Sequence, residues 1–446
     1  MAAEHVVRRA PPPARRRALL LGAVAGALWA LWAQWAAAPE APAEDFVGVA
    51  ARYGYRAERH TVTTEDGYVL TVFRIPRGRR CASGARGPPV LLLNGLLLDA
   101  ETWLAAGPGA ALGFLLPDAC HDTWAGSARG GTHGRAHVRL DPRHAAFWQF
   151  SADEIGRYDV PATVDYVLSR ARAARLHLVG YSQGGGAALV MLAERPRYAR
   201  KVGVLVAAAP VAALRHIASP FGTLLSAAAL AEGALALLGA HEQLGAGSWA
   251  RRLCAARALR RGPCAALLGA LDAPHAGSVA RETYDELFAH FPGGASLRTL
   301  ARYGQHVGAA RFAKYSGGAR ANARRYGGAR APEYSLRAVA ARVVLLQGAA
   351  DALVAPADAR WLARRLPRAE LHVLPDARWN HLDMLLSRHT NRTLFPLLER
   401  ALRRPPDAPR SQRDHFRPGP GVDAWRHPAA GAATPSAESS ASARSR

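Results

Sequence analysis

Lysine is almost missing from this chain, because only two of its 446 residues, Lys201 and Lys314, are of that type. The formal net charge of +24 therefore comes almost entirely from arginine. The arginines are dispersed and do not form a basic patch interleaved with aromatic residues, so the charge predicts no nucleic-acid partner. We interpret it as a compositional bias of the whole gene toward Arg, Ala, Gly and Pro. The alternative is attraction to anionic lipid, at about 1 kcal/mol per well-placed arginine.

Cysteine is also scarce, with four residues in the chain. None of them has metal-ligand spacing with histidine, so the sequence predicts no metal site. Cys254 and Cys264 close a short Arg-rich loop, as a disulfide does in an oxidising compartment. Cys81 and Cys120 stand alone, so one bridge is predicted. The alternative is four buried thiols.

The N-terminus carries the pattern of a secretory signal. Five arginines in the first 17 residues precede an apolar run at 18–38 that is just long enough to span a bilayer. Residues 1–43 are therefore predicted to be either a cleaved signal peptide or a signal anchor. The sequon at Asn391 predicts glycosylation on the same route. The protein is expected to be secreted or lysosomal, or else membrane-associated with its catalytic domain outside the cytosol.

Short apolar runs alternate with helix-like stretches along most of the chain. This alternation predicts an α/β architecture, with a mostly parallel central sheet flanked by helices. The expected strands are two around a turn within 61–75, followed by 90–93, 175–180, 202–209, 342–347 and 370–374.

The strand-like runs disappear between residues 211 and 311, where Ala and Leu recur at helical spacing. We therefore divide the chain into a first part of the core at 44–210, an inserted helical cap at 211–311 and a second part of the core at 312–403. The nearly apolar stretch 221–240 is either the cap's own core or a surface for apolar substrates. Residues 404–446 lack periodicity and are predicted to be a disordered basic tail.

The strongest chemical signal is the pentapeptide Gly180-Tyr181-Ser182-Gln183-Gly184, which matches G-x-S-x-G. It lies between a predicted strand and a predicted helix, the context in which a tight turn exposes a nucleophilic serine. Glycines are needed there because side chains would clash in the turn. We predict that Ser182 is the nucleophile.

A serine hydroxyl needs a histidine base, which in turn needs a carboxylate to orient it. In this kind of site the partners follow the serine in the order acid, then histidine. Asp351 follows a late strand and His381 follows the next one, so these two residues are predicted to complete the triad. Asp358 is the second candidate for the acid, whereas Asp383 is too close to His381 in sequence.

The reaction also needs backbone N–H donors for the oxyanion of the tetrahedral intermediate. One is expected at Gln183, directly after the nucleophile. The other is expected at Leu96, in the loop Asn94-Gly95-Leu96-Leu97 that follows an early strand. The alternative for this loop is an ordinary turn.

Several longer segments, beyond the pentapeptide, resemble one known family. From about residue 45 to 402 the chain is similar to the acid lipases of the lysosomal and gastric type, including the insect members, which are α/β-hydrolases. The segments that carry the likeness are RYGYRAERHTVTTEDGYVLTVFRIP, LLLNGLLLDAETWL, DTWAGSARGGTHGRAHVRLDPRHAAFWQFSADEIGRYDVPATVDYVL, FPGGASLRTLARYGQ, DALVAPAD and WNHLDML.

This resemblance implies the triad and the oxyanion donors already named, and a disulfide in the cap where Cys254 and Cys264 lie. It also implies hydrolysis of neutral lipid esters such as triacylglycerols or steryl esters at an interface, with no cofactor. The chain departs from the family at Asn94 and Tyr181, where the family usually has histidine. Neither position belongs to the triad.

Two other functions remain open from the sequence. A catalytically silent member of the fold would bind lipid without turnover, although all three triad positions are filled here. A soluble carboxylesterase would share the chemistry but not the interface. Activity on an emulsified lipid and on a soluble ester distinguishes these alternatives.

Overall fold

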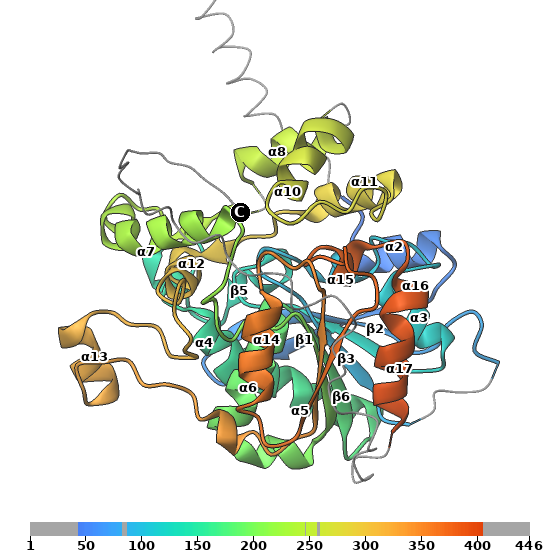
Figure 1. Cartoon of the computed structure of the whole chain (residues 1–446), viewed down its shortest axis with the longest axis horizontal. Coiled ribbons are helices and arrows are strands. Elements are labelled where there is room, and N and C mark those ends of the chain that lie inside the picture. The colour runs from blue at the N-terminus through green and yellow to red at the C-terminus, as the bar shows by residue number, and fades with distance from the viewer. Residues whose placement is uncertain (1–42, 83–86, 246, 257–258, 405–446) are drawn as a thin grey trace, which may run out of the picture. The chain divides into compact units, whose positions relative to one another are not determined.

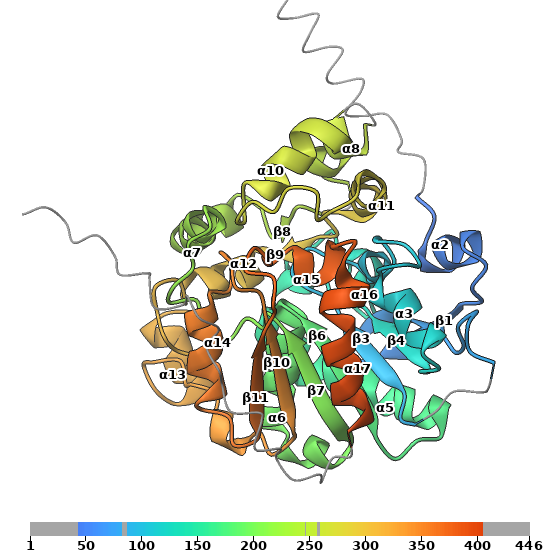
Figure 2. The same cartoon turned by 45° about the vertical axis from the view of Figure 1, so that its right-hand side comes forward.

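The structure is a computed structural model, and it describes residues 43–82, 87–245, 247–256 and 259–404. Its centre is a nine-stranded sheet in the spatial order β1-β2-β4-β3-β6-β7-β10-β11, with β5 paired to β2 (Figures 1 and 2). The strands are β1 Glu58–Thr63, β2 Tyr68–Ile75, β3 Val90–Leu93, β4 Thr123–Gly126, β5 Ala136–His137, β6 Leu176–Tyr181, β7 Val202–Ala208, β10 Val343–Gln347 and β11 Ala369–Val373.

The strands from β4 to β11 run parallel, whereas β1, β2 and β5 form antiparallel pairs at one side of the sheet. Parallel strands require helical crossovers, which cover both faces. The helices of the described residues are α2 Phe46–Arg52, α3 Leu112–Asp118, α4 Ala152–Glu154, α5 Val160–Ala171, α6 Gln183–Glu194, α7 Phe221–Leu237, α8 Trp249–Ala255, α10 Ala265–Gly269, α11 Arg281–His290, α12 Leu297–Gly304, α13 Ala319–Tyr326, α14 Pro356–Ala363, α15 Asp383–Leu386, α16 Thr390–Thr393 and α17 Phe395–Arg403.

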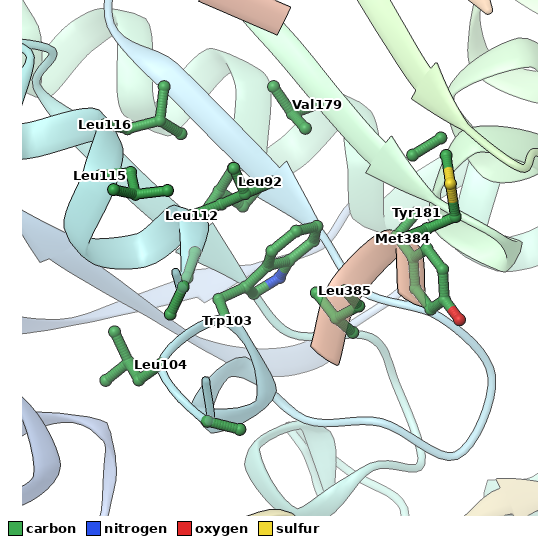
Figure 3. Close-up of a cluster of buried hydrophobic side chains, with 14 of the residues drawn as sticks. Leu92, Trp103, Leu104, Leu112, Leu115, Leu116, Val179, Tyr181, Met384 and Leu385 are labelled. Carbon is green, nitrogen blue, oxygen red and sulfur yellow. The ribbon is translucent and has the colours of Figure 1, made fainter. Parts of the chain in front are cut away.

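Two hydrophobic clusters occupy the two faces of the sheet, because successive side chains of a strand point to opposite sides. Leu92 and Val179 belong to the cluster that includes α2, α3 and α17. Leu91 and Leu178 belong to the cluster that includes α5, α6 and α14. Figure 3 shows part of the first cluster, in which Trp103 lies among leucines that come from a strand, from α3 and from α15. The strands that carry the site are thus fixed from both sides.

The predicted α/β class, with a mostly parallel sheet between helices, is confirmed. The strands expected at 90–93 and 202–209 agree with β3 and β7 to within one residue. The strand β4 was not predicted, because its four residues, Thr-Trp-Ala-Gly, lack the aliphatic run that marks the other buried strands.

Helices α7 to α12 lie between β7 and β10 in the chain. Figures 1 and 2 show α7, α8, α10 and α11 gathered at one end of the sheet. The short strands β8 (Glu242–Gln243) and β9 (Ala295–Ser296) are paired with each other and lie beside these helices in Figure 2. Their arrangement fits the helical cap proposed for 211–311, whose role as a cap remains a prediction. Its helices are positioned to cover whatever site lies at that end.

The two ends of the chain lie outside the described residues. This applies to the signal or anchor predicted for 1–43, of which only the last residue is described, and to the tail predicted for 404–446, of which only the first is. Among the helices that the structure does describe, none combines the length and the apolar character that crossing a bilayer needs.

The structure contains two disulfides, Cys81–Cys120 and Cys254–Cys264. The prediction of a single bridge is therefore wrong, since Cys81 and Cys120 are paired. They are 39 residues apart in sequence, and the loop after β2 meets the end of α3 through a hydrogen bond from Gly78 N to Pro117 O of 3.0 Å. No local pattern signals such a pairing. Two disulfides fit a protein of an oxidising compartment.

The two bridges should contribute unequally to stability, because a disulfide that closes a longer loop restricts the unfolded chain more strongly. Replacing both Cys81 and Cys120 by serine should lower the free energy of unfolding by roughly 4 kcal/mol, given the separation of 39 residues. The same change at Cys254 and Cys264, which are 10 residues apart, should cost about 3 kcal/mol. Urea denaturation followed by circular dichroism measures both. A larger loss for the shorter loop would contradict this account.

Candidate active site

Ser182 occupies the turn between β6 and α6. Its backbone has φ +51° and ψ −115°, a conformation that non-glycine residues rarely adopt. The turn is held by hydrogen bonds from Ser182 N to Ala208 O at 2.9 Å and from Gly186 N to Ser182 O at 3.2 Å. A strained residue fixed in this way directs its side chain away from the sheet, as a nucleophile requires.

The glycines of the turn are required by close packing. A Cβ atom on Gly184 would lie 2.1 Å from the carbonyl oxygen of Leu93 in the neighbouring strand. A Cβ atom on Gly180 would lie 2.6 Å from the Cα atom of Gly185. The sequence pattern therefore reflects the contact of the helix with the sheet, which brings Ser182 close to the loop after β3.

The structure brings the three predicted triad residues together. His381 Nε2 lies 3.0 Å from Ser182 Oγ, and His381 Nδ1 lies 2.9 Å from Asp351 Oδ2. All three side chains are buried. With the Nδ1 proton donated to the carboxylate, Nε2 is free to accept the serine proton. This arrangement can activate a hydroxyl for attack on a carbonyl group.

The Asp351 carboxylate is fixed by further donors from its own surroundings. Its Oδ1 atom accepts from Leu353 N at 3.0 Å and from Val354 N at 2.7 Å. Its Oδ2 atom also accepts from Gln347 Nε2 at 3.1 Å. A buried charge needs such partners to offset its loss of hydration. The orientation of the imidazole is therefore determined before any substrate binds.

The other two aspartates considered for the acid lie elsewhere. Asp358 accepts from the backbone N of His216 at 3.0 Å and pairs with its imidazole at 2.9 Å. Asp383 pairs with His275 Nδ1 at 2.6 Å. Neither carboxylate contacts the Nδ1 atom of His381, which is bonded to Asp351.

Competing effects act on the imidazole of His381. Burial is the largest and disfavours the imidazolium, which lowers its pKa. The charge and hydrogen bond of Asp351, with a further contribution from Asp272, outweigh burial and leave the pKa of His381 above its ordinary value of 6.5. The site therefore favours the protonated histidine that forms when the serine attacks.

The loop after β3 lies beside the serine, and both expected oxyanion donors, Leu96 and Gln183, line the same cavity as Ser182. Asn94 stabilises this loop, because its side-chain amide donates to the carbonyl of Leu98. The loop also accepts a hydrogen bond at Leu97 O from Gly293 N, at 2.7 Å. The side chain of Asn94 thus stabilises the loop to which it belongs.

A cavity of about 440 Å³ opens above the serine. Its size is within the range of about 300–1,000 Å³ that is usual for ligand pockets. Apart from a few polar groups next to the serine, its walls are aliphatic and aromatic. Most of these walls come from the inserted segment 211–311, including its Cys254–Cys264 disulfide. The cavity suits the apolar part of a substrate whose reactive bond lies at Ser182.

Two tyrosines at the site were missed by the sequence analysis as partners of the triad region. The Tyr181 hydroxyl donates to the carbonyl of His381 at 3.1 Å, and the two rings lie 5.1 Å apart. The Tyr303 hydroxyl donates to Gln183 Oε1 at 3.0 Å. Only Tyr181 carried a sequence signal, as a departure from the family pattern. Both tyrosines hold residues next to the serine in place.

Sequence comparison places the chain in a known family. The profile described as alpha/beta hydrolase fold matches residues 88–384, and the profile described as partial alpha/beta-hydrolase lipase region matches residues 46–107. The chain belongs to the α/β-hydrolase lipases. This confirms the family assignment that the sequence segments indicated.

Curated relatives of this lipase family cover most of the chain. Gastric triacylglycerol lipase of Bos taurus is 32% identical over 75% of this chain and 84% of its own length. Lipase 3 of Drosophila melanogaster is 31% identical over 74% and 86%, and lipase member K of Homo sapiens is 28% identical over 78% and 88%. A soluble variant of monoglyceride lipase from Saccharomyces cerevisiae aligns with a TM-score of 0.49 at 15% identity, over 79% of this chain and 98% of that one. The sequence matches, and not this structural alignment, decide the family.

The electrostatics of the histidine can be tested without a substrate. We expect His381 to titrate above 6.5 in the wild type and at a lower pH in Asp351→Asn, because that change removes the charge that raises its pKa. Two-dimensional NMR of ¹⁵N-histidine-labelled protein measures both values, and the spectrum of His381→Gln assigns the signal. In Asp358→Asn the titration of His381 should stay at its wild-type pH. A wild-type value below 6.5 would contradict the proposed electrostatics.

Proposed function

We propose that this protein is a lipase that hydrolyses carboxylic ester bonds of neutral lipids through an acyl-enzyme on Ser182. One observation carries the proposal: the hydrogen-bonded chain of Ser182, His381 and Asp351 opens into an apolar cavity whose rim is apolar as well. The names of the relatives, which include gastric triacylglycerol lipases, support the same activity.

In the first half of the reaction, Ser182 Oγ attacks the ester carbonyl while His381 Nε2 takes its proton. The new C–O bond pushes the carbonyl electrons onto oxygen. The backbone N–H groups of Leu96 and Gln183 then stabilise this oxyanion. When the oxyanion collapses, the ester C–O bond breaks and the alcohol leaves with the proton from His381. Asp351 stabilises the imidazolium throughout.

In the second half, water replaces the alcohol. His381 removes a proton from the water as it attacks the acyl-enzyme carbonyl, and the same two N–H groups stabilise the second oxyanion. Collapse releases the fatty acid and returns the proton to Ser182. The apolar walls of the cavity exclude bulk water. The lower dielectric constant that results strengthens each of these electrostatic interactions.

A lipid substrate is supported by the rim of the cavity. Three residues that line it are also widely exposed: Leu224 at 59%, Trp249 at 64% and Leu267 at 67% of their full surface. Most other exposed large hydrophobic residues in the described part of the chain also lie in the inserted segment, including Leu230 at 90% and Leu237 at 91%. Clustered exposed apolar surface is typical of a site that contacts lipid or another apolar partner.

The secretory compartment is proposed on independent grounds. The two disulfides are typical of a protein in an oxidising environment. The side chain of Asn391 is exposed on α16, where a glycosyl transferase could reach it. We propose secretion or delivery to the lysosome, with glycosylation at Asn391 and with residues 1–43 as the cleaved signal or the anchor.

Removal of the nucleophile is the direct test of the activity. Ser182→Ala should lower kcat by about 10⁴-fold or more on both trioleoylglycerol emulsion and a short-chain soluble ester, because it removes the hydroxyl that forms the acyl-enzyme. Asp351→Asn should lose a similar factor, since the histidine then adopts the wrong tautomer. Titration of released fatty acid at constant pH measures these rates.

The matched control is Asp358→Asn, which removes an equally buried carboxylate that bonds His216 instead. It should retain kcat within about threefold, as expected for a residue outside the hydrogen-bonded triad. Wild-type turnover that survives Ser182→Ala would contradict the mechanism. Lipid binding without any turnover would instead favour a silent binding protein.

The rim can be tested separately from the chemistry. The double variant Trp249→Gln with Leu267→Gln should lower the rate on emulsified trioleoylglycerol at least about tenfold. Each side chain contributes roughly 1.5–3 kcal/mol when it transfers into an apolar phase. The rate on the soluble ester should change much less, because Ser182 and its partners are untouched.

The control for the rim is Val138→Gln with Val373→Gln. These two residues are exposed apolar side chains outside the inserted segment, at 59% and 37% of their full surface. The pair should leave both rates unchanged. Equal losses on emulsion and soluble ester in the rim variant would point to a soluble carboxylesterase rather than an interfacial lipase.

A further inference from the structure

The segment 272–279, here called the strap, lies between α10 and α11 of the inserted segment and crosses the loop that carries His381. Along its length it contacts this loop, the start of α15 and the residues that follow α15. Ala273 O accepts from Asn380 Nδ2 at 2.6 Å, and His275 Nδ1 pairs with Asp383 at 2.6 Å. Ser278 O accepts from Arg388 N at 2.9 Å. The strap therefore binds the histidine loop to the inserted segment.

The first residue of the strap, Asp272, contacts both loops of the triad. Its Oδ2 atom accepts from Leu382 N at 3.0 Å, and its Oδ1 atom accepts from Ala352 N at 3.1 Å. These two N–H groups belong to the residues that directly follow His381 and Asp351. Asp272 is 8% exposed, so water does not readily replace either bond.

We propose that Asp272 is a positioning residue for the hydrolytic site, whose single carboxylate bridges the loop of Asp351 and the loop of His381 and so fixes the imidazole between the acid and the nucleophile. The proposal rests on the proposed function of Ser182, His381 and Asp351. It assigns a role in the reaction to a residue of the inserted segment.

The geometry makes the bridge sensitive to displacement. Each bonded N–H lies one residue beyond a triad residue, so a shift of either loop by a fraction of an ångström lengthens a hydrogen bond to Asp272. The two loops follow different strands, β10 and β11, and one carboxylate holds both. Ala352 is fixed on its other side too, because its carbonyl accepts from Ala218 N at 2.9 Å and from Ser219 N at 3.0 Å.

The negative charge of Asp272 also supports its proposed role, because it raises the pKa of His381. Burial, and then repulsion from Asp351, raise the pKa of Asp272, while His381 and the two N–H donors act against this rise. When Asp272 is ionised, its charge favours the imidazolium of His381. Among the described residues, Asp351 and Asp272 are the charged groups that act on His381. The nearby Tyr181 bonds the carbonyl of His381, and Asp383 at the start of α15 is paired with the strap histidine.

The test follows the reaction of Ser182 with a fluorophosphonate probe in the full-length protein, as a function of pH. This rate reports activation of the serine without depending on which lipid is the substrate. The set consists of wild type, Asp272→Asn, Asp272→Ala, Ser278→Ala, Asp358→Asn and Ser182→Ala. Circular dichroism and the melting temperature of each variant check that it folds.

Asp272→Ala should slow labelling by about 10- to 100-fold, as expected when reacting groups are misplaced by up to an ångström. Asp272→Asn keeps the shape and one acceptor atom, so its loss should be smaller. The labelling rate of Asp272→Asn should rise with pH at a lower midpoint than that of the wild type. The reason is that removing the negative charge of Asp272 lowers the pKa of His381. Ser278→Ala removes the hydroxyl that donates to Asp383 Oδ1 and lies 2.8 Å from Ser387 Oγ. It weakens the strap but keeps the carboxylate of Asp272, so it should leave the midpoint unchanged, as should Asp358→Asn.

The outcomes separate this inference from the proposed function. If Asp272→Asn labels at the wild-type rate and midpoint, the inference is overturned, while labelling of the wild type that is lost in Ser182→Ala keeps the nucleophile intact. If Asp272→Asn is slower but its midpoint does not move, Asp272 is merely structural and the inference is also overturned. A wild type that does not label at Ser182 would remove the proposed function and the inference together.

Discussion

The hydrogen bond between Asp351 and His381 places a carboxylate and a titratable imidazole at the base of an apolar cavity, where ions lose most of their hydration. Such a pair persists only if every remaining oxygen and nitrogen finds a partner. Gln347 and the N–H groups after Asp351 bond the carboxylate, and Ser182 bonds the far nitrogen of the imidazole. The tight turn at Ser182 and the ends of β10 and β11 are arranged around this requirement.

The inserted segment contributes to both sides of this site. Above the serine, its helices, loops and Cys254–Cys264 disulfide form most of the apolar walls of the cavity. Behind the histidine, its strap contacts the loop of His381 and, through Asp272, the loop of Asp351. The inserted segment therefore both lines the substrate cavity and contacts the two loops that carry the triad acid and histidine. This links the recognition of a lipid to the chemistry proposed at Ser182.

The parts that the sequence predicts are those with a local physical signature. The buried strands β3, β6 and β7 are apolar runs, and the turn at Ser182 is marked by glycines that the helix contact requires. The order of the strands after this turn places Asp351 and His381 beyond the carboxyl ends of two neighbouring parallel strands. The rest depends on contacts distant in sequence: Cys81 pairs with Cys120 across 39 residues, and Asp272 lies in a loop that carries no motif. The choice between Asp351 and Asp358 likewise depends on loop geometry, because both follow the same strand.

The proposed mechanism depends on the transfer of an acyl group from a lipid ester to Ser182. The most direct measurement is mass spectrometry of wild-type protein quenched in acid within milliseconds of mixing with a long-chain p-nitrophenyl ester, followed by peptide mapping. We expect a fatty acyl group on the peptide that contains Ser182, with a burst of p-nitrophenol equal in amount to the enzyme whenever deacylation is slower than acylation. An acyl group on another residue, or p-nitrophenol release with no acylated peptide at any quench time, would contradict it.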